Sequence, residues 1–419
     1  MAAPIIASMS QGDFMVSVPK TMPTRPVRRR LLGWAATAVA GAVLPPARAA
    51  EPVLLGLDGE FSVEGSTSAQ AIRAGIEVAL DEINGTGGVL GGRPLALVVR
   101  DNRTMPARSA QNLREFAAMA SLVGVFCGRY SPTVLETVPL VHELRLPLFD
   151  PWASADGIIE HRFQPSYTFR LSMVDSWAMP AIAAHAARHR RRALGLLAVN
   201  TAWGRSSERA LSDHLASGST AQRLVGSRWY NYTDEPAVFA TKYGELLQAG
   251  VDAVVFVGNF REGSELVRAV AARPASERRP VLSHSGVMGG DFFGACGEVL
   301  SQVDVTVVQT FGFAGAKRPR AAAVHAAARR RLGGTGRHLP SPTGVAQAYD
   351  LTHLVARAID TARSAERSAV RDALERLRPF AGLIRDYPVP FTPARHEALT
   401  PGDLYMARFD PDGALVRTR

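Results

Sequence analysis

One stretch of the chain, residues 122–149, predicts two strands with a helix between them. An apolar run over Leu122–Phe126 has the composition of a buried strand, and Gly128 ends it. Ser131 then begins a helix, since serine is a favoured N-cap and the proline after it suits the first helical position. Leu146–Phe149 is predicted as the second strand. Such a strand–helix–strand unit belongs to a parallel sheet with helices on its faces.

This unit places two loops, residues 128–131 and 151–155, at the carboxyl ends of neighbouring strands. Ligands of open α/β sheets bind at that edge. A helix N-terminus beside a free hydroxyl attracts anions, and Arg129 stands two residues before Ser131. The sequence therefore predicts an anion-binding site here.

Strands and helices alternate along the rest of the chain, and the alternation restarts near residues 172–176. The chain has 419 residues, of which 47% are hydrophobic, so it has ample material for two cores. We predict an α/β protein with two doubly wound, Rossmann-like lobes and a cleft between them.

Residues 1–50 carry the features of an export signal. Residues 28–32 (RRRLL) resemble a twin-arginine export motif, and the apolar run Leu31–Leu44 is shorter than the ~20 residues that span a bilayer. A small-x-small site follows, so we expect cleavage near Ala49-Ala50 and a periplasmic location. General secretion, a membrane anchor and a start at Met22 stay open as alternatives.

Charge and cysteine content exclude several classes of protein. The net charge is +10, of which the first 50 residues supply half, and no aromatic residues interleave with the arginine runs, so no nucleic-acid partner is expected. The two cysteines, Cys127 and Cys296, form no C-x-x-C motif. We expect buried free thiols in different lobes, with a disulfide as the alternative.

Familiar catalytic and metal-binding motifs are missing from the sequence. There is no G-x-S-x-G, and the histidine of His396-Glu397 has no second histidine at the spacing of a zinc protease. His185 and His189 have helical spacing, but the arginines around them favour a solvated face over a metal site. We predict a binding protein without catalytic residues, cofactor or metal.

Several motifs, in order, resemble the leucine/isoleucine/valine-binding type of periplasmic solute receptor. The segment GIEVALDEINGTGGVLGGR resembles this family's first signature, and GRYSPT with LPLFDPWASA resembles its pocket segments. Further similarities cover Asn200–Arg209, Val254–Glu262, residues 346–350 and residues 369–374. Together they extend over nearly all of the chain after residue 50.

The resemblance implies a type I periplasmic-binding-protein fold, in which two lobes joined by three crossovers close on a ligand. Lobe 1 would comprise residues 51–171 plus 312–379, and lobe 2 residues 172–311 plus 380–419. The expected function is the substrate-binding component of an ABC importer, a monomer that delivers an amino acid or related small molecule to permease subunits. The alternative is a ligand-sensing regulator or receptor domain of the same fold, for an amide or aromatic acid.

The resemblance also implies the ligand-binding residues. Ser131 matches the serine that meets the ligand carboxylate, beside Arg129. The other matches are the loop of Trp152, Ala153 and Ser154, the lobe-2 aromatics Trp203 and Phe260, and Glu64 near the ligand side chain.

One position departs from the family pattern. Amino-acid receptors of this family place a carboxylate in lobe 2 for the ligand ammonium, but Ser285 stands near that position. A buried ammonium without a counter-charge is unfavourable. An aromatic or aliphatic carboxylate or an amide is therefore a possible ligand, unless Asp175 or Glu262 supplies the missing charge.

Overall fold

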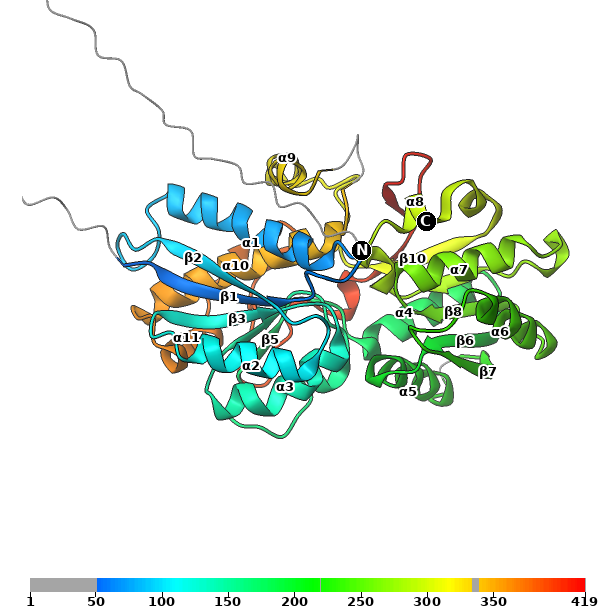
Figure 1. Ribbon diagram of the computed structural model, residues 1–419, viewed down its shortest axis with the longest axis horizontal. Helices are drawn as coiled ribbons and strands as arrows, with labels where there is room; N and C mark the ends of the chain where they lie inside the picture. Colours follow the sequence, from blue (N-terminus) through cyan, green and yellow to red (C-terminus); the bar gives the residue numbers. More distant parts are fainter. Residues whose placement is uncertain (1–50, 219, 334–338, 419) are drawn as a thin grey trace, which may run out of the picture. The chain divides into compact units, whose positions relative to one another are not determined.

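The computed structural model describes residues 51–218, 220–333 and 339–418. The predicted export segment, residues 1–50, lies outside the described residues. Strands and helices alternate and form two α/β lobes, as predicted (Figure 1). Lobe 1 is built on a five-stranded sheet and lobe 2 on a seven-stranded sheet.

The sheet of lobe 1 is entirely parallel and has the order β2-β1-β3-β4-β5. Its strands are β1 (Val53–Gly59), β2 (Leu95–Asp101), β3 (Leu122–Cys127), β4 (Leu148–Asp150) and β5 (Thr168–Arg170). All except the edge strand β2 are almost fully buried, because helices cover both faces of the sheet.

Two helical layers enclose this sheet (Figure 1). The helices of lobe 1 are α1 (Ser68–Gly85), α2 (Pro106–Ala117), α3 (Ser131–Glu143), α9 (Arg320–Leu332), α10 (Pro342–Ala362) and α11 (Arg367–Leu374). Helix α1 packs against α9 and α10, and α2 packs against α3. Neighbouring residues of β1 pack against opposite helical layers. Leu55 belongs to the same apolar cluster as Ile76 of α1, and Leu54 packs against the apolar cluster that contains Leu113 of α2.

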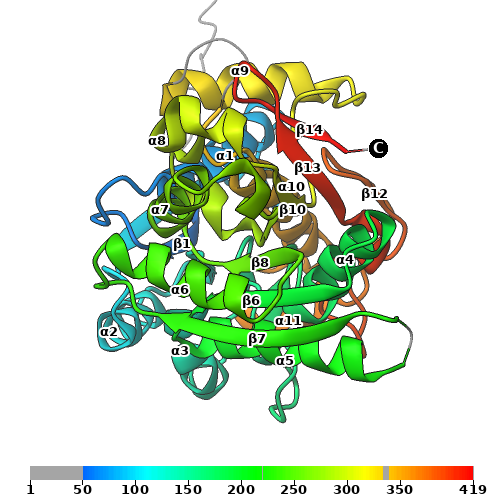
Figure 2. The same ribbon diagram turned by 90° about the vertical axis from the view of Figure 1, so that its right-hand side faces the viewer.

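The sheet of lobe 2 has the order β14-β13-β10-β9-β8-β6-β7, and only β13 runs against the other strands, antiparallel to both β10 and β14 (Figure 2). Its strands are β6 (Ala193–Val199), β7 (Arg223–Tyr230), β8 (Ala253–Val257), β9 (Val281–Ser283), β10 (Val305–Gln309), β13 (Tyr405–Phe409) and β14 (Leu415–Arg417). Its helices are α4 (Asp175–Arg188), α5 (Ala202–Ala216), α6 (Ala237–Gln248), α7 (Phe260–Ala271) and α8 (Phe292–Cys296). Helix α4 packs against α5, and α6 packs against α7.

Each sheet has a switch point where the strand order reverses, between β1 and β3 in lobe 1 and between β6 and β8 in lobe 2. Loops that leave neighbouring strands there run to opposite faces, which opens a crevice at the carboxyl ends. The candidate ligand-binding residues follow these four strands and the adjoining strands β4 and β9.

The segment before β13 contacts lobe 1. The two-stranded ribbon of β11 (Phe380–Ala381) and β12 (Asp386–Tyr387) is anchored by Asp350 of α10, which accepts the backbone N–H of Leu383 at 2.6 Å. Farther on, the N–H of Ala398 donates to the carbonyl of Arg170 in β5. The boundary at residue 380 stays a prediction, and these contacts favour a crossing nearer residue 400.

The two cysteines are free and buried, Cys127 in β3 of lobe 1 and Cys296 in α8 of lobe 2. This confirms the prediction of separate buried thiols. Burial raises the pKa of both thiols, so neither is poised as a thiolate.

Candidate functional site

Six of the nine predicted site residues line one narrow cavity between the lobes, in which the centre of a water molecule can occupy a volume of about 10 Å³. They are Arg129, Ser131, Trp152, Ser154, Trp203 and Ser285. The same cavity is lined by Asn259 and His284, which the sequence did not single out. Ala153 is fully buried in the loop between Trp152 and Ser154.

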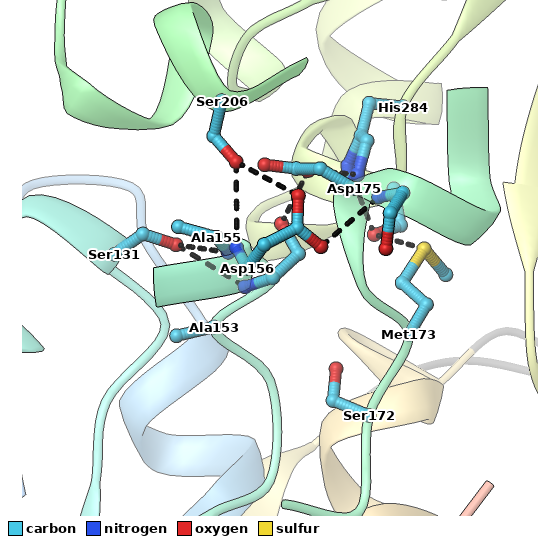
Figure 3. Close-up of polar contacts among 12 residues, drawn as sticks. Ser131, Ala153, Ala155, Asp156, Ser172, Met173, Asp175, Ser206 and His284 are labelled. Carbon is cyan, nitrogen blue, oxygen red and sulfur yellow. Dashed lines mark hydrogen bonds and ion pairs between the residues drawn. The ribbon is translucent and has the colours of Figure 1, made fainter. Parts of the chain in front are cut away.

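Ser131 is the first residue of α3, and Tyr130 occupies the N-cap position, so the prediction of Ser131 as the N-cap was wrong. Its side chain instead reaches the neighbouring loop, where Oγ accepts the backbone N–H groups of Ser154 at 3.1 Å and Ala155 at 3.3 Å (Figure 3). A hydroxyl has two acceptor lone pairs and one donor. With both lone pairs engaged, the hydroxyl of Ser131 can form a further hydrogen bond only as an O–H donor.

The loop after β4 is held by Asp150. Its Oδ1 accepts the N–H groups of Trp152 at 2.9 Å and Ala153 at 2.7 Å, and Ser172 donates to the carbonyl of Trp152 at 2.9 Å. Burial raises the pKa of Asp150 to about 6, although the guanidinium of Arg170 acts in the opposite direction. These bonds fix the loop that faces the cavity.

A buried carboxylate, Asp175, lies behind the cavity wall. Its Oδ1 accepts from the hydroxyl of Ser154 at 3.1 Å and lies 3.2 Å from Nε2 of His284 (Figure 3). Its Oδ2 has no hydrogen-bond partner among the described residues. Ser285 lies on the other side of His284, with its hydroxyl 3.4 Å from Nδ1. The carboxylate that is missing at position 285 is thus present at Asp175, next to Ser154.

Arg129 is buried and makes its contacts within the protein. Its Nε donates to Ser68 at 2.8 Å and lies 3.8 Å from the carboxylate of Glu60, and its guanidinium lies over the ring of Tyr130. Nη1 reaches across the cavity to the side chain of Asn259 in lobe 2. The charge that the sequence analysis assigned to a ligand anion therefore has a built-in partner in Glu60.

Both tryptophans of the cavity pack against glycines. A Cβ on Gly344 would lie 2.4 Å from the ring of Trp152, and one on Gly286 would lie 2.4 Å from the ring of Trp203. Trp203 meets His284 edge-on, with ring centroids 5.1 Å apart. The missing side chains at these glycines allow the indoles to reach the cavity.

The two remaining predicted residues line a wider cavity nearer solvent, in which the centre of a water molecule can occupy a volume of about 360 Å³. The side chain of Glu64 is 93% exposed and lies 3.8 Å from Arg261. Phe260 begins α7 and approaches Gly290. Glu262 lies in the first turn of α7, and burial raises its pKa. Glu64 and Phe260 therefore do not line the inner cavity, although the wider cavity shares Arg129 and Asn259 with it.

Sequence reasoning missed the partners of the site: Glu60, Asn259 and His284. The signals were weak, because Asn259 and His284 merely adjoin the predicted Phe260 and Ser285, and Glu60 follows the first strand. Their importance arises from contacts between distant parts of the chain.

The described residues contain no cluster of three or more histidine, cysteine, aspartate and glutamate side chains that could hold a metal ion. In the same part of the chain, none of the helices combines the length and apolarity required to span a bilayer.

Solved structures with similar folds are numerous. A periplasmic binding protein type 1 from Bordetella pertussis Tohama I has a TM-score of 0.76 at 20% identity, over 88% of this chain and 100% of that chain. A solute-binding protein of an ABC transporter from R. palustris, in complex with 4-hydroxybenzoate, has a TM-score of 0.73 at 16% identity, over 88% and 96%. The branched-chain amino acid transporter substrate-binding protein LivJ from Streptococcus pneumoniae, in complex with isoleucine, has a TM-score of 0.71 at 20% identity, over 88% and 100%.

These identities show the fold, and the two-lobed type I architecture predicted from sequence is confirmed. A search of curated proteins finds no match. A family model described as periplasmic binding protein matches residues 52–414. Proteins of this family bind solutes and are not enzymes, which confirms the prediction of a binding protein without catalytic activity. Because the match spans most of the sequence, this chain belongs to the periplasmic binding protein family.

Proposed function

We propose that this protein is the periplasmic substrate-binding component of an ABC importer and binds an amino acid or a related small carboxylate in the inner cavity. The observation that carries this proposal is the hydroxyl of Ser131, whose two lone pairs accept N–H groups of the loop at residues 154–155. Its proton remains for an acceptor in the cavity.

The surroundings of Ser131 favour a carboxylate as that acceptor. Ser131 begins the 13-residue helix α3, and the N-terminal end of a helix stabilises negative charge. Hydrogen bonds to a carboxylate are roughly twice as strong as neutral ones. The guanidinium of Arg129 lines the same cavity, and its pairing with Glu60 leaves Ser131 and the helix end as the principal anion-binding groups.

The other wall of the cavity can accept a ligand amino group. Ser154 donates its proton to Asp175, so the lone pairs of its Oγ are available to a donor. Asp175 supplies the negative charge that an ammonium requires, and the side chain of Ser154 lies between Asp175 and the ligand. The similar structures hold both kinds of ligand, isoleucine in LivJ and 4-hydroxybenzoate in the R. palustris protein.

Delivery to a permease rests on the family and on the arrangement of the lobes. Ser131 and Ser154 belong to lobe 1 and Trp203 and His284 follow strands of lobe 2, so a ligand between them contacts both. A ligand with contacts to both lobes shifts the population toward the closed form, which an importer can recognise. The predicted export segment is the basis for the periplasmic location.

A thermal-shift screen of the purified protein tests this function. The panel contains branched-chain and aromatic amino acids, their deaminated acids and their amides. A ligand that binds only the folded protein raises the melting temperature by mass action. We expect at least one carboxylate to raise it in a concentration-dependent manner. If no carboxylate in the panel raises the melting temperature, the proposal is contradicted.

A further inference from the structure

We infer that the indole N–H of Trp203 donates a hydrogen bond from lobe 2 to the ligand, so that the ligand carries a second acceptor besides its carboxylate. This inference rests on the proposed function and narrows the class of ligand. The second acceptor is a carbonyl, ether or hydroxyl oxygen that faces lobe 2 when the carboxylate contacts Ser131.

The first observation is an unpaired donor. Trp203 lines the inner cavity and is only 7% exposed, yet its Nε1 finds no hydrogen-bond partner within the described parts of the chain. Buried polar groups in native proteins are almost always paired, and an exception calls for a specific explanation. A ligand acceptor in the cavity supplies one.

The neighbouring polar groups do not supply a partner. The ring of His284 lies edge-on to Trp203, and its Nδ1 lies 3.4 Å from the hydroxyl of Ser285. Its Nε2 lies 3.2 Å from Oδ1 of Asp175, without a hydrogen bond to any described residue. Arg129 offers only donors, which bond to Ser68, Tyr130 and Asn259.

The second observation is the fixed position of the indole. A Cβ on Gly286 would come within 2.4 Å of its Cη2 atom, and Gly204, the next residue, packs so closely on the carbonyl of Val199 that a Cβ would lie 1.9 Å away. Trp203 itself stands in the first turn of α5, whose N-cap Thr201 accepts from Gly204. A donor held by packing loses little entropy on binding, and this favours a role in recognition.

The two donors come from opposite lobes, Ser131 from α3 of lobe 1 and Trp203 from α5 of lobe 2. A ligand with one acceptor for each couples its binding to closure of the lobes. A ligand of the same shape without the second acceptor leaves the indole N–H unpaired.

Two pairs of nearly isosteric probes test the inference. O-methylthreonine differs from isoleucine, and 4-methoxybenzoate from 4-ethylbenzoate, by an ether oxygen in place of a methylene. We expect the wild-type protein to bind the ether of at least one pair roughly tenfold more tightly in isothermal titration calorimetry, the value of one good hydrogen bond. Trp203→Phe keeps an aromatic ring without the N–H, and it should lose this preference. Trp177→Phe, a tryptophan outside the cavity lining, is the matched control and should keep it.

A spectroscopic measurement on the wild-type protein is independent of how the variant folds. The indole N–H resonance of Trp203, assigned by its disappearance in Trp203→Phe, should move downfield on saturation with the preferred ether. A preference that survives in Trp203→Phe, a wild-type protein that prefers neither ether, or an indole resonance that does not move would each overturn the inference while the proposed function stands. Failure of every carboxylate in the thermal-shift panel would instead contradict the proposed function, and this inference with it.

Discussion

Nε of Arg129 lies 3.8 Å from the carboxylate of Glu60, and both side chains are buried. The same carboxylate accepts a hydrogen bond from Ser68 at 2.5 Å, and Ser68 in turn accepts from Arg129. This triad joins the ends of β1 and β3 at the switch point of lobe 1. It makes Arg129 a structural partner of Glu60 more than a ligand for an anion.

Removal of Arg129 alone should therefore destabilise the fold. Arg129→Met leaves Glu60 buried without a counter-charge, and such losses reduce the free energy of unfolding by about 3–5 kcal/mol. The double variant Glu60→Gln with Arg129→Met should regain most of that stability. Urea unfolding measures both, and a double variant no more stable than Arg129→Met would refute the pairing.

Ser131→Ala should act on both the ligand and the loop. Loss of a hydrogen bond to a carboxylate weakens binding by roughly 10- to 100-fold. The N–H groups of Ser154 and Ala155 lose their acceptor, so the unliganded protein should lose about 1–3 kcal/mol of stability. Ser131→Thr retains the hydroxyl and is the control. Unchanged affinity of Ser131→Ala in calorimetry would rule out a contact between this hydroxyl and the ligand.

Asp150 predicts a pH dependence of stability. Its pKa is raised from 3.8 to about 6 in the folded protein, so the fold favours the protonated form. Its contribution is fully present below pH 3.8 and is lost as the pH rises through about 6, and the shift corresponds to about 3 kcal/mol. Asp150→Asn keeps an oxygen for the N–H groups of Trp152 and Ala153 but cannot ionise.

The measurement compares melting temperatures of wild type and Asp150→Asn from pH 3.5 to pH 7.5. Relative to wild type, the variant should gain stability as the pH rises through this window. His161, whose pKa is lowered to about 4, titrates in both proteins and cancels in the difference. A difference that does not vary with pH would show that folding does not raise the pKa of Asp150.

Arg367 should be important for the stability of lobe 1. Its guanidinium donates to the carbonyls of Ala117 at 3.0 Å, Met119 at 3.0 Å and Leu122 at 2.9 Å, and so pairs the C-terminal end of α2 and the start of β3. Arg367→Met should cost about 2 kcal/mol of unfolding free energy. Arg376 is exposed, and Arg376→Met should change stability by no more than ~0.5 kcal/mol. Equal effects of the two substitutions would contradict this role.

The periodicity of the sequence was sufficient to predict the strands and helices, because buried strands and amphipathic helices leave local patterns. Leu122–Phe126 became β3 and Ser131 begins α3, one residue from the predicted start. Export of the chain was also predicted from residues 1–50, and this stays a prediction. Local patterns were therefore reliable for the architecture.

The polar contacts of the site could not be predicted in this way, because each joins residues distant in the sequence. The hydroxyl of Ser131 meets a loop 23 residues farther on, and Asp175 meets His284 across lobe 2. The motif placed Ser131, Ser154 and Trp203 near one another but indicated neither which atoms are already paired nor that Glu60 compensates Arg129. Such pairing is set by tertiary packing.

Calorimetric titration of carboxylates against their primary amides tests the central claim most directly. Isoleucine and isoleucinamide, and 4-methoxybenzoate and 4-methoxybenzamide, differ mainly in the charge at the group that should meet Ser131 and the N-terminus of α3. If either member of a pair binds, we expect the carboxylate to bind at least roughly tenfold more tightly than its amide. An amide that binds as tightly as its carboxylate would contradict the assignment of this cavity as a carboxylate site.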